Sequence, residues 1–514
     1  MASSDGILLK GAPFEDAAAV SSRNASAYRP LHTFELPKGS EKHYAHQFAD
    51  MYFVRLAQLK EAVKQKAHEA WDAFELAGDK AKYVERVLDV RQGELCWVVG
   101  TVYMEMAMKP NVLDDISKEV HKTLLRLSVH AQLTATQHWI AAPPPRQTYV
   151  SPSGTDDMML EDESGRLRVA GNSLNSHYVT GCILAALGTE QADGSFQVIA
   201  TQYADLPRQP QRWETEDASL TLAKDPMSKR EKAGKLAIVS GLDLTGKEED
   251  NVALDLLVEY LSGEAGGPDQ TSASSITRLV IAGNSLSNAS PILSREEFDV
   301  RKGAKRNYGY DSSSYNATPA EKFDAFLSEI LPALPVSVLP GEQDPANVAL
   351  PQQPLHPALF PLSRAYQDPP ALSSETLEGL DLVTNPWEAD VEGWRILGTA
   401  GQTLDDLLKY VEGVRPLDAM EMMLRWRCIA PTAPDTLWCY PFQDDDPLIL
   451  KECPHIYFAG NREKFQAKFV QGPAGQQTLI VGVPKFSKTG QVVLVDMETL
   501  EVETVKLAYV KPRP

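Results

Sequence analysis

The chain has 514 residues, enough for two or three domains, and its 43% hydrophobic and 23% charged residues are typical of a globular protein. Its 50 Lys and Arg against 70 Asp and Glu give a net charge of −20, which argues against tight unaided binding to a nucleic-acid backbone. We expect no secretory signal, and no apolar run approaches the ~18 residues of a membrane span.

Residues 1–40 are rich in Ser, Ala, Pro and Gly without a sustained hydrophobic period, so we expect a mobile arm. The next segment, 41–80, places apolar residues at helical three- and four-residue spacing between His43 and Phe74. The spacing predicts one long amphipathic helix, whose apolar stripe we expect to pack within this chain rather than on another protein. His43 and His46 share a face but have no third ligand nearby, so a metal site is not expected.

Residues 85–206 show the pattern of short strands. Strands are expected at 95–102, 179–188 and 196–203, together with a hairpin over 160–169 that turns at Ser164-Gly165. Their number and spacing fit a small closed barrel such as an OB-fold. A helical insert is expected near 108–148, and the polar stretch 207–235 is expected to be a linker or insert.

OB-folds often bind single strands by stacking bases on aromatic side chains in a basic groove. The aromatic residues of this segment are scattered, at Trp97, Tyr103, Tyr149 and Tyr178, and the hairpin carries acidic residues. We therefore favour a role for these rings in the core, with single-strand binding as the alternative.

From residue 236 to 514 the pattern changes to alternating strands and helices. Strands are expected at 235–240, 276–282 and 336–339, with helices at 251–263 and 320–331 between them. This alternation predicts a parallel sheet, whose ligand sites lie at the carboxyl ends of its strands. A second sheet, packed on the first, is expected from the later strands at 395–398, 455–459, 479–483 and 492–497.

The cysteines, the histidines beside prolines and the acidic run are interpreted here without a catalytic role. The five cysteines form no CxxC pair, which favours reduced core thiols and an intracellular protein. His356 and His455 each lie beside a proline, and we expect them to make structural hydrogen bonds. The acidic run 444–446 is expected to be a solvated loop, with an acidic docking patch as the alternative. Motifs for a serine nucleophile or a phosphate-binding loop are not found in the sequence.

Several long, irregular motifs resemble a known family. They are LEDESGRLRV (160–169), VTGCILAALG (179–188), VIAGNSLS (280–287), PGEQDPANVALPQQPLHPALFP (340–361), TNPW (384–387), LGTAGQ (397–402), IAPTAPDTLWCYPF (429–442), CPHIYFAGN (453–461) and, more weakly, SREEFDV (294–300). On these motifs the chain resembles the B-subunit family of the eukaryotic DNA polymerases alpha, delta and epsilon, and within it the delta B-subunits. The resemblance implies an OB-fold barrel joined to a two-sheet α/β sandwich of the calcineurin-like phosphoesterase type.

Active phosphoesterases of that type hold two metal ions with Asp, Asn and His ligands at the strand ends, which activate water and bind the phosphoryl oxygens. The resemblance places the following residues at those positions: Gly241, Asp243, Asn284, Glu342, Gln343, Asp344, Ala400, Asn461 and Glu463. Glycine and alanine supply no ligand, and neutral amides replace much of the negative charge. We therefore expect a degenerate site without catalysis, metal or other cofactor.

The resemblance also implies the partners. B-subunits of this kind hold the cysteine-rich C-terminal domain of the catalytic subunit of DNA polymerase delta and recruit the third, clamp-associated subunit. The same subunit serves DNA polymerase zeta in translesion synthesis, and both complexes act in the nucleus in DNA replication and repair. Contact with DNA would then be indirect. The rival interpretations are an active metallophosphoesterase and an OB-fold that binds single-stranded DNA.

Overall fold

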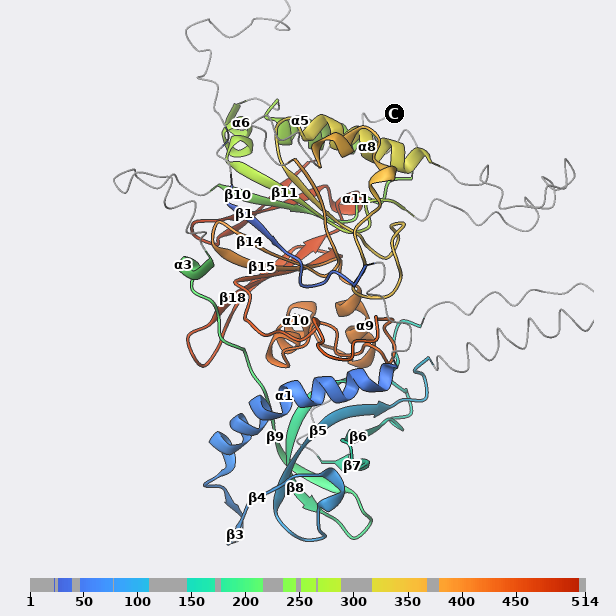
Figure 1. Cartoon of the computed structure of the whole chain (residues 1–514), viewed down its shortest axis with the longest axis vertical. Helices are drawn as coiled ribbons and strands as arrows, with labels where there is room; N and C mark the ends of the chain where they lie inside the picture. Colours follow the sequence, from blue (N-terminus) through green and yellow to red (C-terminus); the bar gives the residue numbers. More distant parts are fainter. Residues whose placement is uncertain are drawn as a thin grey trace, which may run out of the picture.

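The computed structural model describes residues 23, 26–38, 47–76, 78–110, 146–171, 177–215, 234–245, 251–264, 267–287, 317–367 and 379–507 (Figure 1). The expectations for residues 1–22, for His43 and His46, for most of the helical insert and of the 207–235 linker, and for the motif at 294–300 lie outside these residues. Among the helices described, none is both long and apolar enough to cross a membrane.

A closed barrel forms the lower domain in Figure 1. Its strands are β4 (Lys82–Val84), β5 (Cys96–Glu105), β6 (Asp157–Glu161), β7 (Arg166–Ala170), β8 (Ile183–Glu190) and β9 (Phe196–Tyr203). They are ordered β4-β5-β6-β7-β9-β8, and pairing of β5 with β8 closes the barrel. The predicted hairpin is confirmed as the antiparallel pair β6 and β7. Outside the barrel lie β2 (Glu75–Leu76), β3 (Asp79–Lys80) and the short helix η2 (Val87–Asp89).

The strand expected from residue 179 begins only at Ile183, because the chain turns first. Gly181 has a φ of +91° in this turn, and a Cβ there would lie 1.9 Å from the carbonyl oxygen of Pro431 in the other domain. A contact between domains therefore replaces the first residues of the predicted strand.

The predicted long helix is confirmed as α1 (Phe48–Trp71). It lies between the barrel and the second domain in Figure 1, and it packs on β5, β8 and β9. Leu56, Leu59 and Val63 belong to the hydrophobic cluster with the barrel. Met51 at the start of α1 joins a core that reaches α9 (Gln402–Tyr410) and α10 (Pro416–Arg425) of the second domain. One helix thus packs against both domains.

The second domain contains two six-stranded sheets with helices on their outer faces (Figure 1). The first sheet has the order β13-β12-β11-β10-β19-β20, and its parallel strands β10, β11 and β12 confirm the predicted alternation. Its strands are β10 (Lys235–Val239), β11 (Ile276–Ala282), β12 (Val336–Leu339), β13 (Leu380–Leu382), β19 (Gln491–Asp496) and β20 (Val502–Lys506). Its helices are α5 (Asn251–Ser262), α6 (Gly267–Ser274), α8 (Thr318–Ile330) and the short α11 (Phe486–Thr489).

The second sheet has the order β1-β14-β15-β16-β18-β17. Its strands are β1 (Tyr28–Leu31), β14 (Trp387–Val391), β15 (Trp394–Thr399), β16 (Ile456–Arg462), β17 (Gln466–Gln471) and β18 (Gln477–Pro484). The helices α9 (Gln402–Tyr410) and α10 (Pro416–Arg425) cover its outer face, toward the barrel (Figure 1). The remaining short helices are α3 (Arg212–Thr215), η5 (Pro357–Leu359) and η6 (Ser363–Tyr366).

Two expectations about these sheets are wrong. The strand predicted at 492–497 belongs to the first sheet, where β19 pairs with β10 in the antiparallel direction. Part of the segment expected to be a mobile arm is the strand β1, which pairs with β14. Both errors have one physical cause: a strand's pairing partner is set by contacts hundreds of residues away, which local periodicity does not contain.

The connector between the domains, residues 204–212, lies along the second sheet. The side chain of Arg427 donates to the carbonyl oxygens of Ala204, Asp205 and Leu206, and Gln209 exchanges hydrogen bonds with the backbone of Gln477.

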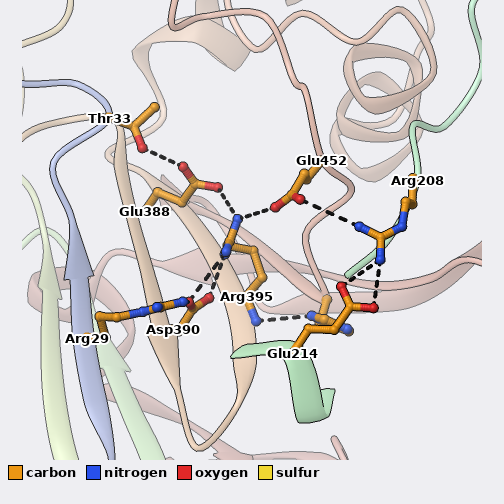
Figure 2. Close-up of polar contacts among 9 residues, drawn as sticks. Arg29, Thr33, Arg208, Glu214, Glu388, Asp390, Arg395 and Glu452 are labelled. Carbon is orange, nitrogen blue, oxygen red and sulfur yellow. Dashed lines mark hydrogen bonds and ion pairs between the residues drawn. The ribbon is translucent and has the colours of Figure 1, made fainter. Parts of the chain in front are cut away.

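Figure 2 shows how an ion-pair network continues from this connector. Arg395 of β15 binds Asp390, Glu388 and Glu452, and Arg208 of the connector pairs with Glu452 and Glu214. Through Asp390 the same network reaches Arg29 of β1.

A buried ion pair crosses the domain boundary and corrects a further expectation. Asp446, in the run expected to be a solvated loop, is 0% exposed and accepts a hydrogen bond from Nε of Arg55 of α1 at 2.5 Å. Its neighbour Asp445 does lie near the surface, where it pairs with Lys451. The five cysteines are buried and free, as predicted.

Candidate functional site

The carboxyl ends of strands from both sheets meet at one edge of the sandwich. The loop after β10 donates a hydrogen bond from the Gly241 N–H to the Gly283 carbonyl after β11. Across the sandwich, the Ser240 hydroxyl lies 3.2 Å from the carbonyl oxygens of Val483 and Pro484 in β18, and accepts from the Asn461 N–H at the end of β16. The strand-end rule therefore brings most of the predicted site residues together.

The loop after β10 holds Gly241 and Asp243, both in the left-handed backbone region. A Cβ at Gly241 would lie 2.7 Å from Oδ1 of Asn461, so a larger residue such as aspartate has room here only if Asn461 shifts. The carboxylate of Asp243 accepts from the Ser487 hydroxyl at 2.7 Å and lies 4.0 Å from Nζ of Lys485. Asp243 thus ties this loop to the segment after β18.

The loop after β11 holds Gly283 and Asn284. A Cβ at Gly283 would lie 2.4 Å from the Cβ of Ala400, so these two loops pack in direct contact. Asn284 has a φ of 52°, and its Oδ1 accepts from the Gln343 N–H at 3.1 Å. The side-chain amide of Asn284 thus binds the neighbouring loop after β12.

The loop after β12 holds Glu342, Gln343 and Asp344. Glu342 is exposed, whereas Asp344 is buried and accepts from the backbone N–H groups of Gly341 at 2.7 Å and Leu286 at 2.8 Å. Burial raises the pKa of Asp344 to about 6, and the N–H donors oppose that rise. Its oxygens are used in joining the second and third loops.

The ends of β15 and β16 supply Ala400, Asn461 and Glu463. Nδ2 of Asn461 donates to the carbonyl oxygens of Ala400 at 2.8 Å and of Ala282 at 3.4 Å, so one amide links both sheets. Glu463 is exposed, and its neighbour Arg462 is the buried side chain, paired with Asp405 through two contacts of 2.8 Å. At this strand end the structure therefore buries the guanidinium of Arg462 close to the site, whereas Glu463, which was predicted for the site, is exposed.

A cluster of amides beneath the site was missed by the sequence analysis. Gln352 Nε2 donates to the Gly341 carbonyl at 3.1 Å, and its Oε1 accepts from Asn385 at 2.8 Å and from Gln402 at 2.9 Å. Asn385 in turn accepts from the Ala400 N–H. Gln352 and Asn385 lie in the motifs PQQPLHP and TNPW, whose irregular sequence was the available signal.

His356, His455, Trp97 and Tyr149 have the structural roles predicted for them. His455 Nδ1 accepts from the Arg395 N–H, and His356 Nδ1 accepts from the Ala358 N–H. Trp97 is buried among Trp71, Tyr83 and His68, and Tyr149 packs edge-on against Tyr410. Trp97 and Tyr149 thus fill a core and a domain contact and are unavailable for stacking on bases. Tyr103 and Tyr178 are half-buried, and Lys109 and Arg166 lie over the ring of Tyr103.

The donor set does not fit a two-metal centre. Within the described ranges, no group of three or more His, Cys, Asp or Glu side chains is arranged to hold a metal ion. Asp344 accepts from backbone N–H groups, and Asp243, Asn284 and Asn461 each make a hydrogen bond to a neighbouring loop. Oδ1 of Asp243 and Oδ1 of Asn461 are buried without a hydrogen-bond partner. These hydrogen bonds join the loops of the two sheets to one another.

Comparison with known proteins gives two family matches and several full-length relatives. Residues 47–201 match the OB-fold domain of the DNA polymerase delta subunit, and residues 236–468 match the B-subunit of DNA polymerase alpha/epsilon. The chain is 34% identical to the DNA polymerase delta small subunit of Saccharomyces cerevisiae, over 91% of this chain and 90% of that protein. It is 34% identical to the Arabidopsis thaliana small subunit (96% and 98% covered) and 32% identical to DNA polymerase delta subunit 2 of Drosophila melanogaster (95% and 99% covered).

Proposed function

Because the chain belongs to the family of DNA polymerase delta small subunits, we propose that it is the non-catalytic scaffold of that polymerase. It holds the cysteine-rich C-terminal domain of the catalytic subunit and recruits the third, clamp-associated subunit, for DNA replication and repair in the nucleus. Sharing with the catalytic subunit of DNA polymerase zeta in translesion synthesis is part of the same proposal. The protein reaches DNA through its partners, because its own net charge is −20.

The second part of the proposal is that the sandwich is a degenerate calcineurin-like phosphoesterase domain. The observation that supports it is that several polar side chains at the ligand positions, above all Asp344 and Asn461, make hydrogen bonds between loops. A dinuclear site needs carboxylate and imidazole groups that are free to coordinate. Here a glycine, an alanine and three amides occupy such positions.

Metal content and hydrolysis test this part together. Purified protein, incubated with Mn²⁺, Fe²⁺ or Zn²⁺ and then desalted, is expected to retain less than one equivalent of metal and to leave bis(p-nitrophenyl) phosphate intact. Two equivalents of metal with turnover would refute the loss of catalysis. A D344N variant is the control, because a true metal site would lose both metal and activity with it.

The scaffold role is supported by how firmly the two domains are joined. Barrel residues such as Val98 and Leu184 share one buried hydrophobic cluster with Leu404, Leu407 and Met420 of the sandwich. The helix α1 and the connector 204–212 add polar contacts across the same boundary. Partner sites on either domain therefore keep a fixed relation to each other.

Co-purification tests the scaffold role. The chain is co-expressed with the cysteine-rich C-terminal domain of the polymerase delta catalytic subunit of the same organism, and separately with the third subunit. We expect a stable one-to-one complex in each case at 150 mM salt. Absence of both complexes would overturn the proposal.

A further inference from the structure

The two flanks of the sandwich differ in how their outermost strands are covered. On one flank, β1 from the N-terminal segment pairs with β14 at the edge of the second sheet, and its residue Tyr28 reaches across to the first sheet. The Tyr28 hydroxyl donates to Asp381 of β13, and the guanidinium of Arg278 lies 3.5 Å from the ring centroid. A strand recruited from more than 300 residues away thus closes this flank.

The opposite flank is open. β17 and β20 are the last strands of their sheets, and a groove of about 460 Å³ separates them. Ala467 and Phe469 of β17 line one side of it, and Leu500 and Val502 line the other. Phe469 is 53% exposed, and Leu479 and Leu500, which also line the groove, belong to the hydrophobic cluster between the two sheets. The apolar interior of the sandwich therefore reaches solvent through this groove.

The backbone of β17 is suited to accept another strand. Within the described residues, β17 pairs with β18 and with no other strand. The Gln471 carbonyl accepts a hydrogen bond from Arg425 and not from β18. Backbone N–H and C=O groups alternate in direction along a strand. The backbone groups of Phe469 and Ala467, two and four residues earlier in β17, therefore also point away from β18. An edge of this kind is a template for strand addition.

The charges at the rim indicate what such a strand carries. Asp496, Glu501 and Glu503 line the groove against two lysines. Of these, Lys235 pairs with Glu503, and Lys468 pairs with Asp418 and Glu421 of α10, so each lysine is already committed to a carboxylate. With Glu503 paired to Lys235, Asp496 and Glu501 remain as the excess of carboxylates at the rim. This excess favours a basic partner and disfavours a second copy with the same acidic rim.

We propose that β17 binds an extended segment of another DNA polymerase delta subunit as an added strand of the second sheet. An apolar side chain of that segment enters the groove beside Phe469, and a Lys or Arg next to it lies against Glu501. This rests on the proposed scaffold function and names one of its contact surfaces. The edge β20 is less suited, because Glu503 and Lys506 place charges along it.

Hydrogen–deuterium exchange of the assembled subunits tests the inference. This chain is measured alone and in a complex with the catalytic and third subunits of the same organism, following a peptide that covers 466–471. We expect exchange in β17 to slow at least about tenfold on assembly. The F469A variant should weaken the affinity for one of the two partners by about tenfold or more, and E501K should weaken the same partner.

A matched control separates this site from a general loss of apolar surface. F53A removes a ring of nearly equal exposure, 52%, from α1, and it should leave the affinity for that partner within about twofold of wild type. Unchanged exchange of β17 in an intact complex would overturn this inference and leave the scaffold function standing, whereas failure of the complex to form would overturn the scaffold function. A dimer of the chain alone that F469A abolishes would assign the edge to a second copy and also overturn the inference.

Discussion

The ion pair between Arg55 and Asp446 gives the sharpest test of how the domains are joined. Arg55 is 2% exposed, and its guanidinium donates to Asp446 and to the carbonyl oxygens of Pro431 and Ala433. Asp446 also accepts from the Leu448 N–H at 2.9 Å. The pair is thus hydrogen-bonded on both sides, so the loss of one partner leaves a buried charge without compensation. Such a loss costs about 3 to 5 kcal/mol.

The variants R55M, D446N and R55M/D446N turn this reasoning into a double-mutant cycle. Urea unfolding followed by circular dichroism should show each single variant destabilised by about 3 to 5 kcal/mol, and the double variant by clearly less than the sum. R55M keeps the aliphatic stem, and Asn keeps the acceptor for Leu448, so packing changes little. A loss below about 1 kcal/mol in R55M, or additive losses in the double variant, would refute the assigned role of the pair.

Three further changes have expected outcomes. Burial lowers the pKa of His455 to about 4. The contribution of neutral His455 to the free energy of unfolding is therefore complete above pH 6.5 and is lost as the pH falls toward 4. The H455N variant should flatten the acid limb of a stability–pH curve by up to about 1.4 kcal/mol per pH unit. The raised pKa of Asp344, about 6, has the opposite effect on stability, because the folded state takes up this proton before the unfolded state does as the pH falls. The free energy of unfolding of D344N should therefore fall more steeply than that of the wild type between pH 6 and 4. Equal slopes for the two proteins would contradict this prediction. G181A should lower the melting temperature far more than G194A, because both glycines have positive φ but only Gly181 would meet the Pro431 carbonyl.

Local sequence patterns predicted the elements whose identity is decided locally. The alternation of apolar strands with amphipathic helices identified β10, β11, β12, α5 and α8 within a few residues, and the Ser164-Gly165 turn identified the β6–β7 hairpin. The place of β1 and β19 in the sheets could not be predicted in this way. Their pairing depends on β14 and β10, which are separated from them by more than 200 residues.

The candidate site shows the same division. That Asn284 and Asp344 would lie near each other followed from their positions at the carboxyl ends of parallel strands. Asn461 was placed beside them only by the family resemblance. The hydrogen-bond partner of each side chain did not follow, because it depends on how loops that are far apart in the sequence are placed in space. At the end of β16, for example, Arg462 is buried and Glu463 is exposed, and the sequence did not indicate which of these two side chains would be buried.

The interlocked loops have a mechanical consequence for a scaffold. In a working metal-dependent hydrolase, side chains at the strand ends must stay free to coordinate metal ions. Here Asn461 and Asp344 join the same loops through direct hydrogen bonds. Such bonds persist without a bound ion, and together with the core shared between barrel and sandwich they connect the parts of the molecule into one body. A partner held by the barrel and another held by the edge β17 would then be kept at a fixed distance, whatever the metal concentration around them.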